Sequence, residues 1–150
     1  MSLTNIFDIA GSGMAAQSIR LNTTASNIAN ADSASSSTDE VYRARKPVFS
    51  AIQQDAMSQA LGGQAGDMSG NLSASQGVQI EGIVESDAPL NMRFEPDHPL
   101  ANEKGYVMYP NVNVVEEMAD MLSASRSFQT NVSVMDSAKT MMQRLLTLGQ

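Results

Sequence analysis

The two ends of this chain carry apolar residues that recur at every seventh position. In the first thirty-one residues the recurring side chains are Phe7, Met14, Leu21 and Ile28. In residues 111–150 the same spacing is kept by Val114, Met121, Phe128, Met135 and Met142. A seven-residue apolar repeat is typical of helices that pack side by side as a coiled coil. We therefore predict one long helix at each end of the chain, and we expect the two helices to pair with each other.

A second row of positions interleaves with each repeat. Near the start, these positions hold Ala10, Gln17, Thr24 and Ala31. Near the end of the chain, the interleaved positions hold Met118, Ser125, Val132, Lys139 and Leu146. Polar residues in such a row weaken the contact between helices, and ordering the backbone of both helices costs much conformational entropy. We infer that a lone pair of these helices is marginal and becomes ordered only on assembly with neighbours.

Charge is spread unevenly along the chain. Residues 1–31 carry only Asp8 and Arg20, whereas residues 32–110 carry sixteen charges and residues 111–150 carry seven. A long helix with two charges is expected to be buried on more than one face. The formal net charge of −7 argues against a nucleic-acid partner. The chain has no cysteine, which excludes disulfides, thiolate metal ligands and cysteine nucleophiles.

Local signals predict where the helices begin and weaken. Asn113 is a suitable N-cap three residues before Glu116, and Glu116 and Glu117 would lie near the positive end of the helix dipole. Gly11 and Gly13 each disfavour a helix by about 1 kcal/mol relative to Ala. A kink or a frayed first turn is therefore expected near these two glycines.

Four regions follow from these patterns. They are an N-terminal helix of the coiled-coil core (residues 1–31), an extended or irregular linker region (32–77), a small β-rich region (78–110) and a C-terminal helix of the core (111–150). Strands are expected over residues 78–84, 90–94 and 106–109, and residues 41–49 could pair at a sheet edge. The predicted fold class is mainly α, with a small β-rich middle and flexible linkers between the long paired helices.

One glycine pattern suggests a nucleotide site. Residues 11–16 read Gly-Ser-Gly-Met-Ala-Ala, with Asp32 about twenty residues further on, which matches a dinucleotide-binding fingerprint. Such a loop needs a buried strand before it. The preceding Ile6-Phe7-Asp8-Ile9 is short and charged, so we favour glycines that belong to a helix.

The single histidine gives a weak catalytic signal. His98 lies between Glu95-Pro96-Asp97 and Pro99, where two carboxylates and an imidazole could form a general base or a metal cluster. A lone histidine between two prolines is more often a turn residue. The sequence shows no second imidazole, no nucleophile elbow and no phosphate-binding loop, so an enzyme is not the favoured interpretation.

The N-terminal residues MSLTNIFDIAGSGMAAQ lack a basic leader and an unbroken apolar stretch, so they do not resemble a secretory signal peptide. No later stretch is long and apolar enough to span a bilayer. We expect the chain either to stay in the cytosol or to leave the cell by a route that reads no such leader.

Four segments resemble a known family. They are GSGMAAQSIRLNTTASNIANADS near the start, YRARKPVF and GIVESDAPL in the middle, and PNVNVVEEMADMLSASRSFQTNV near the end. Together they resemble the bacterial flagellar basal-body rod proteins, over nearly the whole chain. The segment Ala25-Ser26-Asn27-Ile28-Ala29-Asn30 is similar to a helix end shared among flagellar axial proteins, and the PNVNVVEEM and GIVESDAPL segments point to the proximal rod component.

The resemblance implies a structural subunit of the rod that spans the periplasm. Such a subunit would be exported unfolded by the flagellar type III apparatus and would polymerise with sibling rod proteins and copies of itself into a shaft that transmits torque from rotor to hook. It would need no substrate, metal or cofactor. The subunit-interaction seam would then be Phe7, Met14, Leu21, Ile28, Val114, Met121, Phe128, Val132, Met135 and Met142. The alternative is a small non-enzymatic binding or adaptor module that uses the β-rich middle.

Overall fold

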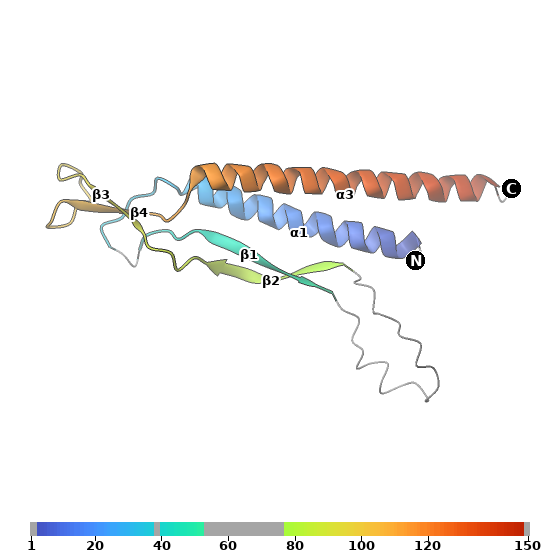
Figure 1. Ribbon diagram of the computed structural model, residues 1–150, viewed down its shortest axis with the longest axis horizontal. Coiled ribbons are helices and arrows are strands. Elements are labelled where there is room, and N and C mark those ends of the chain that lie inside the picture. The colour runs from blue at the N-terminus through green and yellow to red at the C-terminus, as the bar shows by residue number, and fades with distance from the viewer. Residues whose placement is uncertain (1–2, 38–39, 53–76, 149–150) are drawn as a thin grey trace, which may run out of the picture.

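The computed structural model describes residues 3–37, 40–52 and 77–148. Its elements follow in the order α1 (Leu3–Ala29), β1 (Arg45–Ala51), β2 (Val78–Glu85), β3 (Asn91–Phe94), β4 (Tyr106–Tyr109) and α3 (Val114–Leu148). The two long helices lie side by side and run in opposite directions, so the start of α1 and the end of α3 are at the same end of the molecule (Figure 1). The predicted fold class, long terminal helices around a small β-rich middle, is confirmed.

The start of α3 is capped as the sequence predicts. The Asn113 side-chain oxygen accepts a hydrogen bond from the Val115 N–H at 3.2 Å, and the Asn113 carbonyl accepts one from the Glu117 N–H at 3.0 Å. Glu116 and Glu117 lie in the first turn, where the helix dipole favours negative charge. The Asn113 side chain therefore satisfies an N–H group, that of Val115, that has no partner within the helix.

The expected kink at the two glycines is wrong, because α1 runs without a break from Leu3 to Ala29. A side-chain carbon on Gly13 would come within 2.7 Å of the Asn131 amide nitrogen of α3, whereas one on Gly11 would meet nothing within 4 Å. Gly13 therefore lies where the two helices approach closely, and contact with α3 offsets its low helix propensity.

Among the described residues, the β-rich middle contains two separate two-stranded antiparallel sheets. Strand β1 pairs with β2 from Arg45↔Glu85 to Ala51↔Val78, with a bulge between Val48 and Phe49, and both strands contact α1. Strand β3 pairs with β4, and this second sheet projects past the end of the helices (Figure 1).

The expected strands lie close to the observed ones, and the edge strand expected over residues 41–49 is observed as β1. This strand falls within residues 32–77, which the sequence interprets as extended or irregular. The Gly- and Ser-rich stretch over residues 53–76 lies outside the described residues.

The buried core is small and consists mainly of small side chains. Between the helices, the most deeply buried apolar residues are alanines: Ala10, Ala16, Ala124 and Ala138. A second cluster joins the end of α1 to the chain on either side of the sheets, and it contains Ala31, Ala44 and Val112 with Tyr42 and Val114 packed against it. Small residues let the two helices approach closely, but they bury little apolar area.

The structure shows where the two motifs that suggested ligand chemistry lie. Residues 11–16 lie inside α1 and do not connect a strand to a helix, so they do not form a dinucleotide-binding loop. His98 lies in the turn between β3 and β4, where its Nδ1 accepts a hydrogen bond from the Leu100 N–H at 3.1 Å. Within the described ranges, no group of three or more His, Cys, Asp and Glu side chains is arranged to hold a metal ion. Neither α1 nor α3 is long and apolar enough to cross a membrane.

Candidate assembly interface

The predicted seam residues differ in how far they are exposed. Nine of them are half-buried: Phe7, Met14, Leu21, Ile28, Val114, Met121, Phe128, Met135 and Met142. The tenth, Val132, is 37% exposed. The structure thus places most of the seam at partly covered positions of the helix pair and Val132 towards its outer side.

The second row of α3 differs from the one that the sequence suggested. Its buried positions come three residues after each seam residue, at Glu117, Ala124 and Ala138, with the half-buried Asn131 between them. The positions four residues after are more open, since Met118 is 56% and Leu146 is 68% exposed. A close contact between helices selects small side chains, and these give a weaker hydrophobic signal than Met or Leu.

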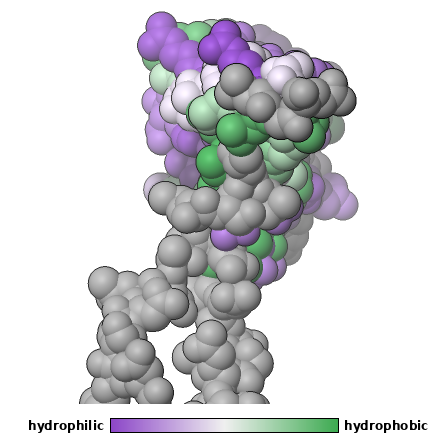
Figure 2. All heavy atoms as spheres, turned by 90° about the vertical axis from the view of Figure 1, so that its right-hand side faces the viewer, coloured by the Kyte–Doolittle hydropathy of each residue, from purple (hydrophilic) through white to green (hydrophobic). Residues whose placement is uncertain are grey.

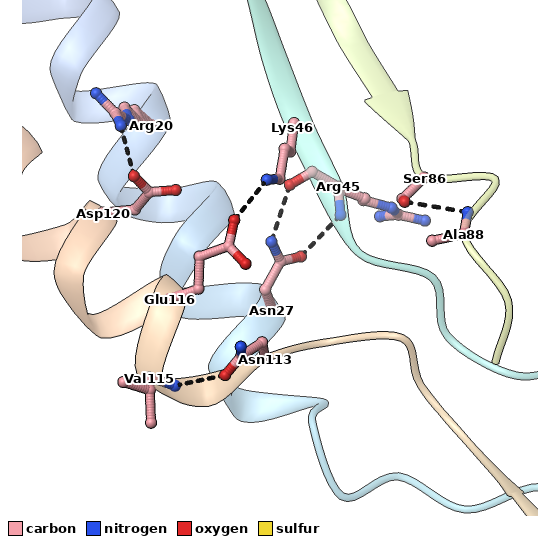
Figure 3. A network of polar contacts seen from close by, with 10 residues as sticks. All are labelled: Arg20, Asn27, Arg45, Lys46, Ser86, Ala88, Asn113, Val115, Glu116 and Asp120. Atoms are coloured by element: carbon pink, nitrogen blue, oxygen red, sulfur yellow. Dashed lines mark hydrogen bonds and ion pairs between the residues drawn. The ribbon is translucent and has the colours of Figure 1, made fainter. Parts of the chain in front are cut away.

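An ion pair fixes how α1 and α3 are aligned along their length. The Arg20 Nη2 atom lies 2.7 Å from the Asp120 Oδ1 atom (Figure 3), and the two side chains are 27% and 35% exposed. Arg20 is one of only two charged residues in the first thirty-one. Sliding one helix past the other by a turn would separate this pair, so it specifies the alignment of the otherwise small apolar contact.

A buried amide joins α1 to the first sheet. Asn27 is 0% exposed, and its side-chain oxygen accepts hydrogen bonds from the Tyr42 hydroxyl at 2.8 Å and from the Arg45 N–H at 2.9 Å. Its amide nitrogen donates to the Arg45 carbonyl at 2.8 Å (Figure 3). Buried polar groups of this kind need partners, and Asn27 therefore holds the start of β1 against the C-terminal part of α1.

Tyr42 lies among charged groups at this junction. Burial raises the pKa of its hydroxyl, and the nearby Glu117 carboxylate adds to the rise, whereas Arg45 acts in the opposite direction. The Arg45 guanidinium stacks over the Tyr42 ring at 5.4 Å and pairs with Glu85 of β2 at 3.0 Å. The junction thus combines a satisfied buried amide with an ion pair at its surface.

A second amide gathers the loops near the start of α3. The Asn111 oxygen accepts from the Ala44 N–H at 2.8 Å, and its nitrogen donates to the carbonyls of Ser86 at 3.2 Å and Ala88 at 2.9 Å. None of the sequence patterns described above pointed to Asn111. Its neighbours Pro110 and Val112 are buried in the structure, but the sequence alone does not show this.

Large apolar side chains remain uncovered on the outer sides of the helices. On α3 the most exposed are Val115, Met118, Leu122, Val134, Met141, Leu145 and Leu146, and on α1 they are Ile9 and Ile19. The end view in Figure 2 shows hydrophobic residues between hydrophilic ones at the end where α1 begins and α3 ends. Exposed apolar surface of this extent is typical of protein–protein contacts.

The sequence is similar to known flagellar rod proteins, which form assemblies of the kind that such apolar surface suggests. A family model described as "Flagella basal body rod protein" matches residues 7–34, and one described as "Flagellar basal body rod FlgEFG protein C-terminal" matches residues 103–148. The chain is 49% identical over 150 residues to the flagellar basal-body rod protein FlgC of Salmonella typhimurium, with all of both chains covered. The chain belongs to the FlgC family of flagellar basal-body rod proteins.

More distant FlgC proteins match over the same full length. Identity is 48% to FlgC of Escherichia coli O6:H1 and 33% to FlgC of Bacillus subtilis, again with all of each chain covered. The resemblance read from the sequence is therefore confirmed. As a FlgC-family member, the protein is a structural subunit of the flagellar basal-body rod, and it assembles there with other rod components.

The two rod-protein family models coincide with the helix pair. The model that matches residues 7–34 covers most of α1, including Asn27. The model that matches residues 103–148 covers β4 and all of α3. The rod-protein signature thus lies on the elements that carry the ion pair, the close helix contact and the uncovered apolar side chains. These elements form the candidate assembly interface.

Proposed function

We propose that this FlgC-family protein polymerises through its paired terminal helices into the helical shaft that transmits torque from rotor to hook. The observation that carries the proposal is the apolar surface left open on both helices. Val115 is 77%, Leu122 is 58% and Leu146 is 68% exposed in the single chain. Neighbouring subunits that cover these side chains would supply the burial that the small alanine-rich core lacks.

Contacts between different faces of neighbouring subunits suit a shaft. When one face of a subunit binds a different face of the next subunit, repeating the contact adds subunits along an open helix. A ring forms instead only if the rotation from one subunit to the next brings the last subunit back to the first. The helix pair offers such unlike faces, because α3 presents a largely apolar end and the opposite end carries the charged junction with β1. We propose that copies of this chain and sibling rod proteins meet through these faces.

We infer that the protein acts without catalysis, a small-molecule substrate or a cofactor. The residues that suggested such chemistry have structural roles that support this inference. Gly13 permits the close contact of α1 with Asn131, and the His98 side chain accepts a backbone hydrogen bond within its turn.

We further propose that the protein lies in the periplasmic part of the rod and reaches it through the flagellar export apparatus, without cleavage of a signal peptide. A helix pair of low stability supports this route, because a marginal fold is easily exported as an unfolded chain. Mass spectrometry of the protein in purified basal bodies tests it. A chain that retains its first residues is expected, and a mature N-terminus within α1 would contradict the route.

An uncovered residue gives the sharpest test of assembly. In cells that lack the native gene, we expect Leu122→Asp to abolish incorporation into basal bodies and swimming, because it places a charge on a surface to be buried. The purified variant should keep its helical signal, since exposed substitutions change stability by about 0.5 kcal/mol or less. Ser123→Asp, which adds the same charge at an exposed polar neighbour, is the matched control. Normal incorporation of Leu122→Asp would contradict the proposal.

A further inference from the structure

The sheet formed by β3 and β4 carries uncovered aromatic side chains on one face. Phe94 of β3 is paired with Tyr106 of β4, and their rings meet edge to face with centroids 5.3 Å apart. Phe94 is 63% exposed, Tyr106 is 41% exposed, and Met92, which shares this face of β3, is 64% exposed. The other face holds Val107 and Tyr109, and both are buried. The chain therefore covers one face of this sheet and leaves the aromatic face open.

Gly105 holds the Phe94 ring in place. Its φ is +79°, and a side-chain carbon at this position would come within 2.9 Å of the Phe94 Cε2 atom. The ring thus packs against the Gly105 backbone and the edge of Tyr106, although most of it is exposed. An aromatic ring that is fixed before binding loses little conformational entropy when a partner covers it, and such residues are frequent anchors of protein interfaces.

The tip of the same hairpin is acidic. Residues 95–104 connect β3 to β4 and carry Glu95, Asp97 and Glu103 against one base, Lys104. Asp97 and Glu103 are exposed, and neither pairs with another described residue. The hairpin projects past the end of the helices (Figure 1). Its open aromatic face and acidic tip together match a partner surface with basic groups among apolar side chains.

The last turns of α3 have this chemistry. From residue 137 to the end of α3, the charged residues are Lys139 and Arg144, and both are exposed without an ion pair in the described part of the chain. The apolar side chains around them are 50%, 59% and 68% exposed at Met141, Leu145 and Leu146. The whole chain has a net charge of −7, so copies repel one another in general. A basic segment is where an acidic surface of another copy is attracted.

These last turns also form a step beside the shorter helix. Gly13 of α1 lies against Asn131 of α3 in an antiparallel pair, so Leu3, ten residues earlier, lies near Met141, ten residues later. The rest of α3 extends past the start of α1 (Figure 1). The step and the projecting hairpin are at opposite ends of the molecule, so they cannot meet within one chain. Contact between them requires two copies arranged head to tail.

We propose that the aromatic face of the β3–β4 hairpin of one copy docks on the last turns of α3 of the next copy, with Asp97 and Glu103 facing Lys139 and Arg144. This inference rests on the proposed function and specifies which unlike faces meet. At one end of each copy the face is the uncovered step of α3. At the other end it is the hairpin, which lies beyond the junction of α1 with β1.

Charge reversal tests the contact in cells that lack the native gene. Asp97→Lys with Glu103→Lys, and separately Lys139→Glu with Arg144→Glu, should each lower the number of copies per purified basal body by about tenfold or more, because like charges then face each other. A chain that carries all four substitutions should recover most of the lost copies, since every copy then presents both reversed surfaces. No recovery would show that the partner of either surface is another protein, and it would overturn the inference.

Two controls separate this effect from misfolding and from a change of net charge. All four substituted residues are exposed, so the purified variants should keep the helical signal of the unaltered protein. Glu81→Lys on β2 and Arg126→Glu on α3 make the same charge changes at exposed positions away from both surfaces, and they should incorporate normally. Losses in these controls as large as those of the reversed variants would contradict the proposed pairing.

Crosslinking tests whether the two surfaces meet between copies. The chain has no cysteine, so Phe94→Cys combined with Leu145→Cys should give disulfide-linked copies in oxidised basal bodies, and Phe94→Cys or Leu145→Cys alone should not. If Leu122→Asp blocks incorporation but no such linkage forms, this contact is overturned and the proposed function stands. Normal incorporation of Leu122→Asp would instead overturn the proposed function, whatever the crosslinking shows.

Discussion

Gly13 of α1 lies so close to Asn131 of α3 that a methyl group on Gly13 would come within 2.7 Å of the Asn131 amide nitrogen. The next glycine along the helix, Gly11, meets nothing within 4 Å. Two glycines with the same propensity cost therefore have different roles. Gly13 permits the helix contact, whereas Gly11 only weakens the helix.

This difference predicts unequal effects of adding a methyl group. Gly11→Ala should stabilise the helix pair by about 1 kcal/mol, because alanine is the better helix former. Gly13→Ala should gain less, since Asn131 must move to make room. Thermal melting of the helical circular-dichroism signal measures both effects. Adding Asn131→Ala to Gly13→Ala should recover the missing gain, and equal gains for the two single variants would contradict the close contact.

The buried Asn27 amide should be essential for attaching the first sheet. Asn27→Ala leaves the Tyr42 hydroxyl and both backbone groups of Arg45 without partners, and each unsatisfied buried group costs about 1–3 kcal/mol. We expect a loss of at least about 2 kcal/mol in thermal or urea unfolding and faster proteolysis near residues 40–52. The exposed Asn22→Ala should change stability by about 0.5 kcal/mol or less. Similar losses for the two variants would show that the Asn27 bonds do not hold the sheet.

The Arg20–Asp120 pair should contribute about 0.5–1 kcal/mol, because both side chains are partly exposed to water. Arg20→Glu and Asp120→Lys should each lower the unfolding midpoint, and the combination should restore part of the loss. The coupling should shrink at high salt, where charges are screened. A double-mutant cycle with no coupling at low salt would rule out a role for this pair in aligning the helices.

Stability should fall in alkaline solution because of Tyr42. Burial raises the pKa of this hydroxyl above its value of about 10 in the unfolded chain. The folded protein therefore holds the proton more tightly, so this contribution is complete below about pH 10 and is lost as the pH rises through the folded-state pKa.

Unfolding measured from pH 9 to 11 tests this dependence. Tyr42→Phe should reduce the alkaline loss of stability. The Tyr109 hydroxyl, whose pKa is also raised by burial and by its hydrogen bond to Glu95, is expected to account for part of the remainder. An unchanged pH profile in Tyr42→Phe would contradict this assignment.

The repeats at the two ends predicted the helices because they are strong, local signals. The cap at Asn113 and the strands near residues 78–84, 90–94 and 106–109 were predicted for the same reason. The sequence placed the second row of α3 at the wrong positions. The closest contact between the helices uses Ala124 and Ala138, and alanine contributes little to a pattern of hydrophobic residues. The kink was wrongly expected because the benefit of Gly13 depends on α3, which follows it in sequence by about a hundred residues.

The amide contacts could not be predicted from local patterns. Asn27 and Asn111 hold backbone groups of segments 18 and 67 positions away, at Arg45 and Ala44. Nothing in the spacing of the asparagines indicates those partners. The division of the middle into two sheets likewise depends on strand pairing, which short strands of similar composition leave open.

Hydrogen exchange tests most directly the claim that neighbouring subunits order the terminal helices. Amide exchange would be measured by mass spectrometry on the purified protein and on the same protein within isolated basal bodies. We predict that α1 and α3 exchange quickly in the free chain and become strongly protected in the rod, whereas β4 and the loops held by Asn111 change less. Equal, strong protection of both helices in the free chain and in the rod would contradict the account.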